Sequence, residues 1–182
     1  MKQVKKTWII LGIILFCLTP LLNHPALAQK PKLPDHLVKL GMMVNIVKLT
    51  RWPHELQEPF TFCFVKAQKL SSAMHGLQDL QIHGMSVKTI NKKADNGLGE
   101  CQVLYLGGNY SGSIPKITLP LNQKPILTFS DHLDFLDGGG AFAFYRLGAK
   151  MRFAVSRNHL RPTGLKVSSE VLKLATIHRE KE

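Results

Sequence analysis

The sequence predicts an α/β protein with a mostly parallel, Rossmann-like sheet, helices on both faces, and a C-terminal β-hairpin followed by a helix. Three observations predict this fold. Short apolar segments of strand length alternate with segments whose apolar residues recur at helical spacing, as in a parallel sheet covered by helices. Residues 142–155 contain two runs of alternating apolar and polar residues around a Gly-containing turn, the pattern of a β-hairpin. Residues 165–177 then return to a broad apolar stripe at helical spacing.

The chain has 182 residues, of which 45% are hydrophobic, and this length favours one domain with a substantial core. Its formal net charge is +12. Three of the basic residues, Lys2, Lys5 and Lys6, lie in a segment that we expect to be removed, which leaves 21 basic and 12 acidic side chains. No later run of Lys or Arg exceeds two residues. We therefore interpret the charge as a solvated positive surface and expect no nucleic-acid partner.

Residues 1–28 have all the parts of a secretory signal peptide. The three lysines form a positive start, and residues 8–18 are an apolar segment too short to cross a bilayer comfortably. Ala26-Leu27-Ala28 is a small-x-small cleavage site before Gln29. We expect residues 29–182 to be exported as one domain; an uncleaved membrane anchor is the alternative. The residues around Cys17 do not form a convincing lipoprotein signal.

The mature chain begins with a predicted helix at residues 36–51, which Pro53 ends. Residues 60–65 are a continuous apolar run, typical of a strand buried on both faces. The segment from Pro115 to Pro120 is left unassigned, because its prolines and β-branched residues weaken a helix there. The other predicted elements before the hairpin are a helix at 71–80 and strands at 85–90, 101–106 and 125–129.

A recurring set of residues marks the C-terminal part: Gly139, Gly140, Phe144, Arg152, Phe153, Gly164, Leu165, Ser168, Ser169, Leu172 and Leu174. This set resembles the signature of the YfiR family, a group of small periplasmic proteins. The first helix also matches that family, through Asn45, Lys48 and the Trp52-Pro53 pair that follows it. Most of the matching residues have a structural explanation, as glycines with backbone freedom or as core residues, so they indicate a fold before a function.

The exported segment contains two cysteines, Cys63 and Cys101, in predicted strands of one sheet. An even number of cysteines in an oxidising compartment favours a disulfide. The resemblance also implies this bond, because YfiR-like proteins have a cysteine in the first strand bridged to one near the third. Two buried free thiols are the alternative. A second bridge near the hairpin, present in some members, has no cysteines here.

The other chemical patterns in the sequence are weak. The histidines lack the spacing of a metal site, and we assign no metal or cofactor. Ser130-Asp131-His132 contains the three residue types of a catalytic triad, but adjacent residues do not have triad geometry. Gly107, Asn109 and Ser111 follow a predicted strand, at the sheet edge where parallel sheets bind ligands. They are candidate ligand contacts, with a plain turn as the alternative.

The resemblance implies a non-enzymatic periplasmic regulator. It would bind and inhibit the periplasmic domain of an inner-membrane diguanylate cyclase, lowering cyclic di-GMP and restraining biofilm formation. Homodimers are common among such regulators, so a second copy of the chain is another candidate partner. The alternative function is a periplasmic small-ligand-binding sensor or a transport accessory protein that uses the strand-end crevice. A hydrolase is disfavoured because no catalytic cluster is evident.

We expect partner binding at the C-terminal helix, predicted over residues 169–177. Its apolar residues surround much of the helix at a step of about 100° per residue, so they cannot all face one sheet. Leu172, Leu174 and Ile177 are therefore the candidate partner contacts. The alternative is that the helix is wedged between the sheet and the first helix.

Overall fold

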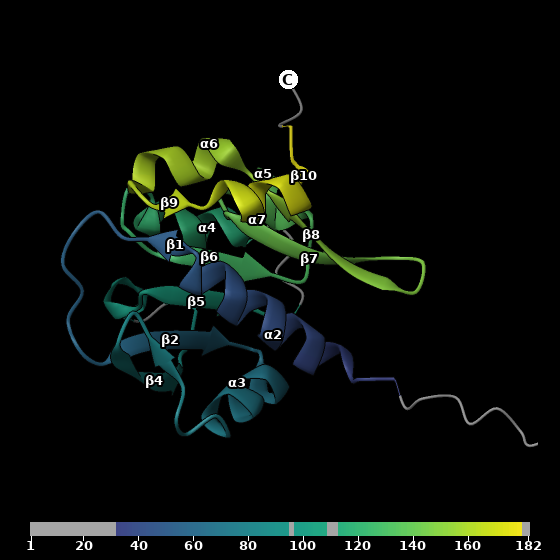
Figure 1. Ribbon diagram of the computed structural model, residues 1–182. Coiled ribbons are helices and arrows are strands. Elements are labelled where there is room, and N and C mark those ends of the chain that lie inside the picture. Colours follow the sequence, from purple (N-terminus) through teal and green to yellow (C-terminus); the bar gives the residue numbers. More distant parts are fainter. Residues whose placement is uncertain (1–31, 95–96, 109–112, 180–182) are drawn as a thin grey trace, which may run out of the picture. The chain divides into compact units, whose positions relative to one another are not determined.

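The computed structural model describes residues 32–94, 97–108 and 113–179, and the described residues from Leu33 onward form one compact unit. Within them an eight-stranded sheet forms the centre of the fold (Figure 1). Its spatial order is β10 (Thr176–Ile177), β8 (Lys150–Val155), β7 (Phe142–Leu147), β6 (Leu127–Ser130), β5 (Val103–Leu106), β2 (Phe60–Val65), β4 (Met85–Asn91) and β3 (Gln81–Ile82). A separate two-stranded ladder joins β1 (Thr50–Arg51) to β9 (Lys166–Val167).

The sheet is mostly parallel, as predicted, but it is mixed and not the purely parallel sheet of a Rossmann fold. The five strands β4, β2, β5, β6 and β7 run parallel to one another. At either end of this group, β3 runs antiparallel to β4 and β8 runs antiparallel to β7. The cause is local: only two residues separate the strands in each of these pairs, and so short a connection can only reverse the chain. The predicted hairpin around Gly148 is the second of these pairs.

Helical segments contribute to a hydrophobic cluster on each face of the sheet. Alternation along β2 shows the two faces, because Phe60, Phe62 and Phe64 lie in one cluster whereas Cys63 and Val65 lie in the other. The first cluster also contains residues of α2 (Asp35–Lys48), α3 (Gln68–His75), α6 (Arg157–Leu160) and α7 (Ser169–Leu174). The second contains residues of η2 (Leu98–Glu100), α4 (Ile114–Thr118), η3 (Leu119–Leu121) and α5 (Asp134–Asp137).

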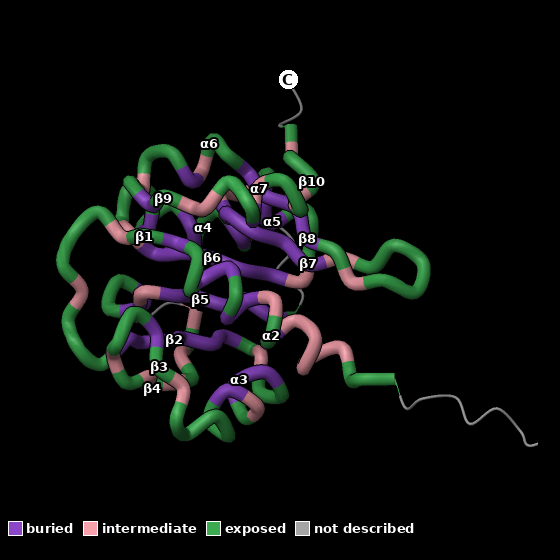
Figure 2. The backbone as a smooth tube through the Cα atoms, viewed as in Figure 1, coloured by how far each residue is buried: buried purple, intermediate pink, exposed green. Residues whose placement is uncertain are grey.

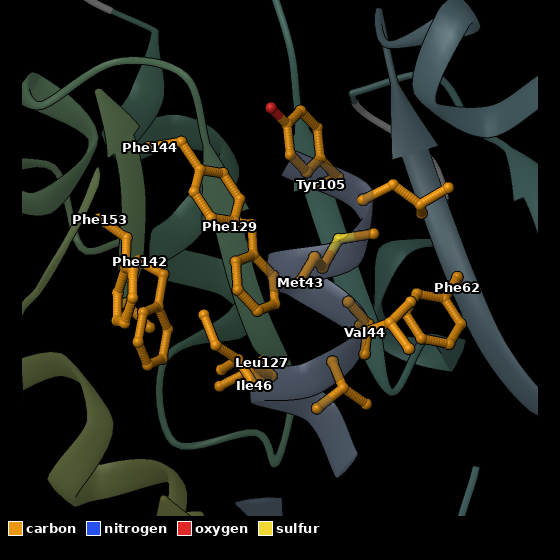
Figure 3. Close-up of a cluster of buried hydrophobic side chains, with 14 of the residues drawn as sticks. Met43, Val44, Ile46, Phe62, Tyr105, Leu127, Phe129, Phe142, Phe144 and Phe153 are labelled. Carbon is orange, nitrogen blue, oxygen red and sulfur yellow. The ribbon is translucent and has the colours of Figure 1, made fainter. Parts of the chain in front are cut away.

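The larger cluster lies between α2 and the aromatic residues of the central strands. Figure 3 shows Met43 of α2 directed toward the side chains of Tyr105 and Phe129. The rings of Phe129 and Phe144 stack with their centroids 5.8 Å apart. Figure 2 shows that the buried residues are concentrated in the central strands, whereas the tip of the β7–β8 hairpin is exposed. This packing fixes α2 across the sheet.

The first two helices differ from their predicted bounds. The helix predicted at 36–51 ends at Lys48, because Thr50 and Arg51 pair with β9 instead. The helix predicted at 71–80 is α3, which begins three residues earlier and ends at His75. The carbonyl of Ala67 accepts hydrogen bonds from the amides of Leu70 and Ser71, so Ser71, where the predicted helix begins, lies inside the helix.

Other corrections concern short elements. The unassigned segment after Ser113 forms α4 and then η3, and Pro115 is tolerated because it lies in the first turn. The predicted strand at 101–106 begins at Val103, and the one at 125–129 shifts to Leu127–Ser130. The helix predicted at 169–177 ends at Leu174, after which the chain becomes extended and joins the sheet as β10.

Candidate functional site

The C-terminal segment that carries the predicted partner residues is anchored at both ends. At its start, Lys166 and Val167 pair with β1, and the amide of Ser168 donates to the carbonyl of Leu49 at 2.9 Å. At its end, β10 pairs with β8. The side chain of Ser168 also caps α7 by accepting from the amide of Glu170 at 3.2 Å. The segment is therefore held in a defined position along its whole length.

Side-chain bonds strengthen the anchoring of β10. The hydroxyls of Tyr145 and Thr176 lie 2.6 Å apart, and Nε2 of His178 lies 2.7 Å from Oδ1 of Asp137. The amide of His178 donates to the carbonyl of Val155 at 2.8 Å. These bonds tie β10 to the hairpin and to α5. The sequence pattern did not reveal β10, because it is only two residues long and continues the apolar stripe of the preceding helix.

The three predicted partner residues have different environments. Leu174 is 70% exposed and Ile177 is 41% exposed, whereas Leu172 is half-buried against the main hydrophobic cluster. Val171, on the same helix, is buried and holds α7 to the core. We call the exposed pair Leu174 and Ile177 the C-terminal apolar ridge. Because the segment is already anchored, these side chains can contact a partner without the loss of backbone conformational entropy that ordering a flexible segment would require.

A shallow depression of about 290 Å³ lies beside α7. Leu172 lines it together with Leu160, Leu165 and Val167, and Arg157, Arg161 and Lys166 also contribute to its walls. The predicted partner residues are therefore distributed between a ridge and a neighbouring depression of mixed apolar and basic character.

A second depression, of about 500 Å³, lies at the carboxyl ends of β2, β5 and β6. We call it the strand-end crevice. Its lining includes Tyr105, Asp131 and Lys39, which form a hydrogen-bonded group. The Tyr105 hydroxyl donates to Oδ1 of Asp131 at 2.5 Å, and Nζ of Lys39 lies 2.5 Å from the same oxygen. Burial, and then the charge of Asp131, raise the pKa of Tyr105, so its hydroxyl remains a donor.

The strand-end crevice was predicted only in part. Gly107 lines it, whereas Asn109 and Ser111 lie outside the described residues. Sequence analysis missed Lys39, Tyr105 and Asp131 as a group. Asp131 comes two residues after the strand predicted at 125–129, and a polar residue near that strand end was the available signal. Ser130 is buried and His132 is exposed, so the adjacent residues of the Ser-Asp-His sequence lie in different environments.

The disulfide predicted between Cys63 and Cys101 is present. Their Cα atoms lie 5.8 Å apart, and the bond closes a loop with a sequence separation of 38 residues. Cys63 lies in β2 as predicted, but Cys101 lies just before β5, because that strand starts later than expected. Both cysteines belong to the hydrophobic cluster on the face covered by α4 and α5.

These features define a mixed α/β domain with an anchored apolar ridge at one end and a polar crevice at the carboxyl edge of its parallel strands. The YfiR/HmsC-like family matches residues 36–176, and the chain belongs to that family. Membership supports, in general terms, a periplasmic, non-catalytic role in regulating cyclic di-GMP signalling. In the residues that the structure describes, none of the helices is long and apolar enough to cross a membrane.

The fold is also similar to that of a solved structure, a conserved domain protein from Vibrio cholerae O1 biovar El Tor. The TM-score is 0.55 at 10% sequence identity, and the match covers 81% of this chain. This chain spans 61% of the length of that protein. The likeness concerns the fold alone.

Proposed function

We propose that this protein is a periplasmic regulator that binds the periplasmic domain of an inner-membrane diguanylate cyclase and holds the cyclase inactive. Lower cyclic di-GMP and less biofilm would follow. Family membership supports the general role. The observation that carries the proposed contact is the C-terminal apolar ridge, because Leu174 is largely exposed on a segment that pairs with β1 at its start and with β8 at its end.

The ridge has the features of a contact surface. Exposed leucines that occur singly are common, but Leu174 and Ile177 lie three residues apart on the same segment as Leu172, which lines the depression. An apolar partner side chain placed there would bury the ridge without disturbing Val171, which already packs in the core. A second copy of the chain is the other candidate occupant.

The test compares two exposed leucines. Leu174→Glu places a charge on the ridge, and Leu119→Glu places the same charge on η3, where Leu119 is 66% exposed. Binding to the cyclase periplasmic domain and cellular cyclic di-GMP are measured for both variants, with circular dichroism to check folding. We expect Leu174→Glu to lose binding and to raise cyclic di-GMP, whereas Leu119→Glu behaves as the wild type.

Two results would contradict the proposal. One is retention of cyclase binding by a folded Leu174→Glu variant. The other is equal loss of binding in both variants, because the effect would then not depend on the ridge. If Leu174→Glu instead abolishes only self-association, measured by sedimentation, the ridge is a dimer contact.

A further inference from the structure

The strand-end crevice lies at the point where the order of the parallel strands reverses. From β2 the chain passes through α3 to β4 on one side, and β5 then pairs with the opposite edge of β2. The connections that leave β2 and β5 therefore diverge, which opens a crevice beyond their carboxyl ends. The depression of about 500 Å³ is found at this place, with Lys66, Ala67 and Gly107 in its lining.

Two backbone segments that line the strand-end crevice, at Lys66 and Gly107, approach each other closely. A Cβ added to Gly107 would lie 2.7 Å from the carbonyl oxygen of Lys66, so only glycine fits there. Lys66 itself has a φ of 50°, an uncommon conformation for a residue with a side chain. The sequence thus permits the connections after β2 and β5 to meet closely while leaving the space above them open.

The charges around the strand-end crevice favour an anion. Three lysines line it, Lys39, Lys66 and Lys69, against two aspartates, Asp35 and Asp131. Asp35 is also paired with Arg146, which supplies a further positive charge to the group. Asp131 is engaged with Lys39 and Tyr105. Lys66 and Lys69 are both exposed and line the strand-end crevice.

The N-terminus of α3, which borders the strand-end crevice, lacks the residues that usually stabilise the start of a helix. The N-cap of α3 is Ala67, whose side chain makes no capping hydrogen bond, and Lys69 lies in a first turn that contains no acidic residue. Alanine is a poor N-cap, and a cation near a helix N-terminus opposes the helix dipole. An anion in the crevice would relieve both effects. Residues that are unfavourable for local structure, such as these at a helix N-terminus, are expected where a functional site determines the residue type.

We propose that the strand-end crevice binds a small phosphate-bearing anion, such as a phosphate monoester, with Lys66 and Lys69 as its principal contacts. Phosphate suits the crevice because lysine ammonium groups act as flexible point charges toward its oxygens. Gly107 also lines the crevice, as do Lys39 and Asp131, which form an ion pair. This binding is independent of the partner surface proposed above, which lies on β10 and α7.

The test measures phosphate binding to the exported protein at physiological ionic strength. Inorganic phosphate and glycerol 3-phosphate are titrated by calorimetry, with glycerol as the uncharged control. The same titrations follow the backbone amide signals of Lys66 and Gly107 by NMR. We expect saturable binding of both phosphates, no binding of glycerol, and shifts of these two amides.

The key variant is the pair Lys66→Gln and Lys69→Gln. The matched control, Lys88→Gln with Lys150→Gln, removes the same charge from exposed positions on β4 and β8. We expect the crevice variant to bind phosphate about tenfold more weakly or worse, as for the loss of one charge-assisted hydrogen bond. The control variant should bind as the wild type.

The proposal fails if the wild type shows no saturable phosphate binding at millimolar concentration. It also fails if the crevice and control variants lose affinity equally, because the attraction would then reflect overall charge. Circular dichroism checks that both variants are folded and compares their unfolding temperatures with that of the wild type. Cyclase binding by the crevice variant separates the outcomes, because the ridge would remain intact.

Discussion

Tyr105 of β5 and Asp131, the residue after β6, are joined by a 2.5 Å hydrogen bond in which the tyrosine hydroxyl is the donor. Lys39 of α2 contacts the same carboxylate oxygen. The three residues come from three elements, so this group fixes the position of α2 over the carboxyl ends of the strands. Tyr105 is buried, which places the hydrogen bond at the border between the core and the strand-end crevice.

Removing the Tyr105 hydroxyl should destabilise the fold. Tyr105→Phe keeps the ring that packs with Phe64 and Phe144 but removes the donor to Asp131. Hydrogen bonds to charged groups contribute about 1.5–3 kcal/mol, so the free energy of unfolding should fall by roughly that amount. Urea denaturation measures the change. Unaltered stability would show that Lys39 alone satisfies the carboxylate.

The same tyrosine should make stability decrease at alkaline pH. Its pKa is raised in the folded chain by burial and by Asp131, whereas in the unfolded chain it is about 10. Above pH 10 the unfolded chain therefore binds fewer protons than the folded chain, and the free energy of unfolding falls as pH rises. The contribution approaches about 1.4 kcal/mol per pH unit. Tyr105→Phe should show a shallower decline between pH 9.5 and 11, and parallel curves would refute this.

Loss of the disulfide should be costly. The Cys63–Cys101 bond closes a loop with a sequence separation of 38, and the chain-entropy model assigns it about 3–4 kcal/mol. Replacing both cysteines by alanine should lower the free energy of unfolding by about 2–5 kcal/mol. Peptide mapping without reductant should recover the linked pair from exported wild-type protein. Two free thiols under denaturing conditions would contradict the bond.

Alanine substitution should have opposite effects on stability at two of the glycines. A Cβ on Gly140 would lie 2.1 Å from the ring of Phe135, which is fully buried, so Gly140→Ala should destabilise by about 1–3 kcal/mol. Gly41 lies on the exposed side of α2 with nothing within 4 Å of the added atom. Gly41→Ala should stabilise by up to about 1 kcal/mol. Thermal unfolding of both variants tests the pair, and destabilisation by Gly41→Ala would be unexpected.

Export with cleavage after Ala28 remains a prediction, because residues 1–28 lie outside the described residues. The intact mass of protein recovered from the periplasm should correspond to a chain that begins at Gln29. Ala28→Arg should block cleavage, since the site requires a small residue there. Wild-type protein that retains Met1 in the membrane fraction would support the uncleaved anchor instead.

Local pattern predicted the strongest elements of this fold. The continuous apolar run at residues 60–65 became β2, and the alternating runs around Gly148 became the β7–β8 hairpin. The first helix was predicted to within one residue at its start. These elements follow from hydrophobic periodicity and turn chemistry, which are properties of consecutive residues. The bounds failed where distant residues pair, as at Thr50 with Val167.

The candidate sites divide in the same way. Cys63 and Cys101 were paired from the count, the compartment and the resemblance, and Gly107 was identified from its place after a strand. Lys39, Tyr105 and Asp131 are far apart in the sequence, and no periodicity links them. Their association required the strand order, which places the ends of β5 and β6 beside each other and α2 above them.

The sequence by itself indicated the family, the two-sided burial of β2 and the hairpin, because each depends on residue type and local spacing. The disulfide followed from the cysteine count, the expected export and the family resemblance. The tertiary structure decided that β3 adds a second antiparallel pair, that the last helix stops at Leu174, and that Ile177 lies in an edge strand. It also decided which apolar residues remain exposed. These features depend on long-range strand pairing and on which side chains fill the core. Both are properties of the assembled fold, so the pattern of neighbouring residues does not predict them.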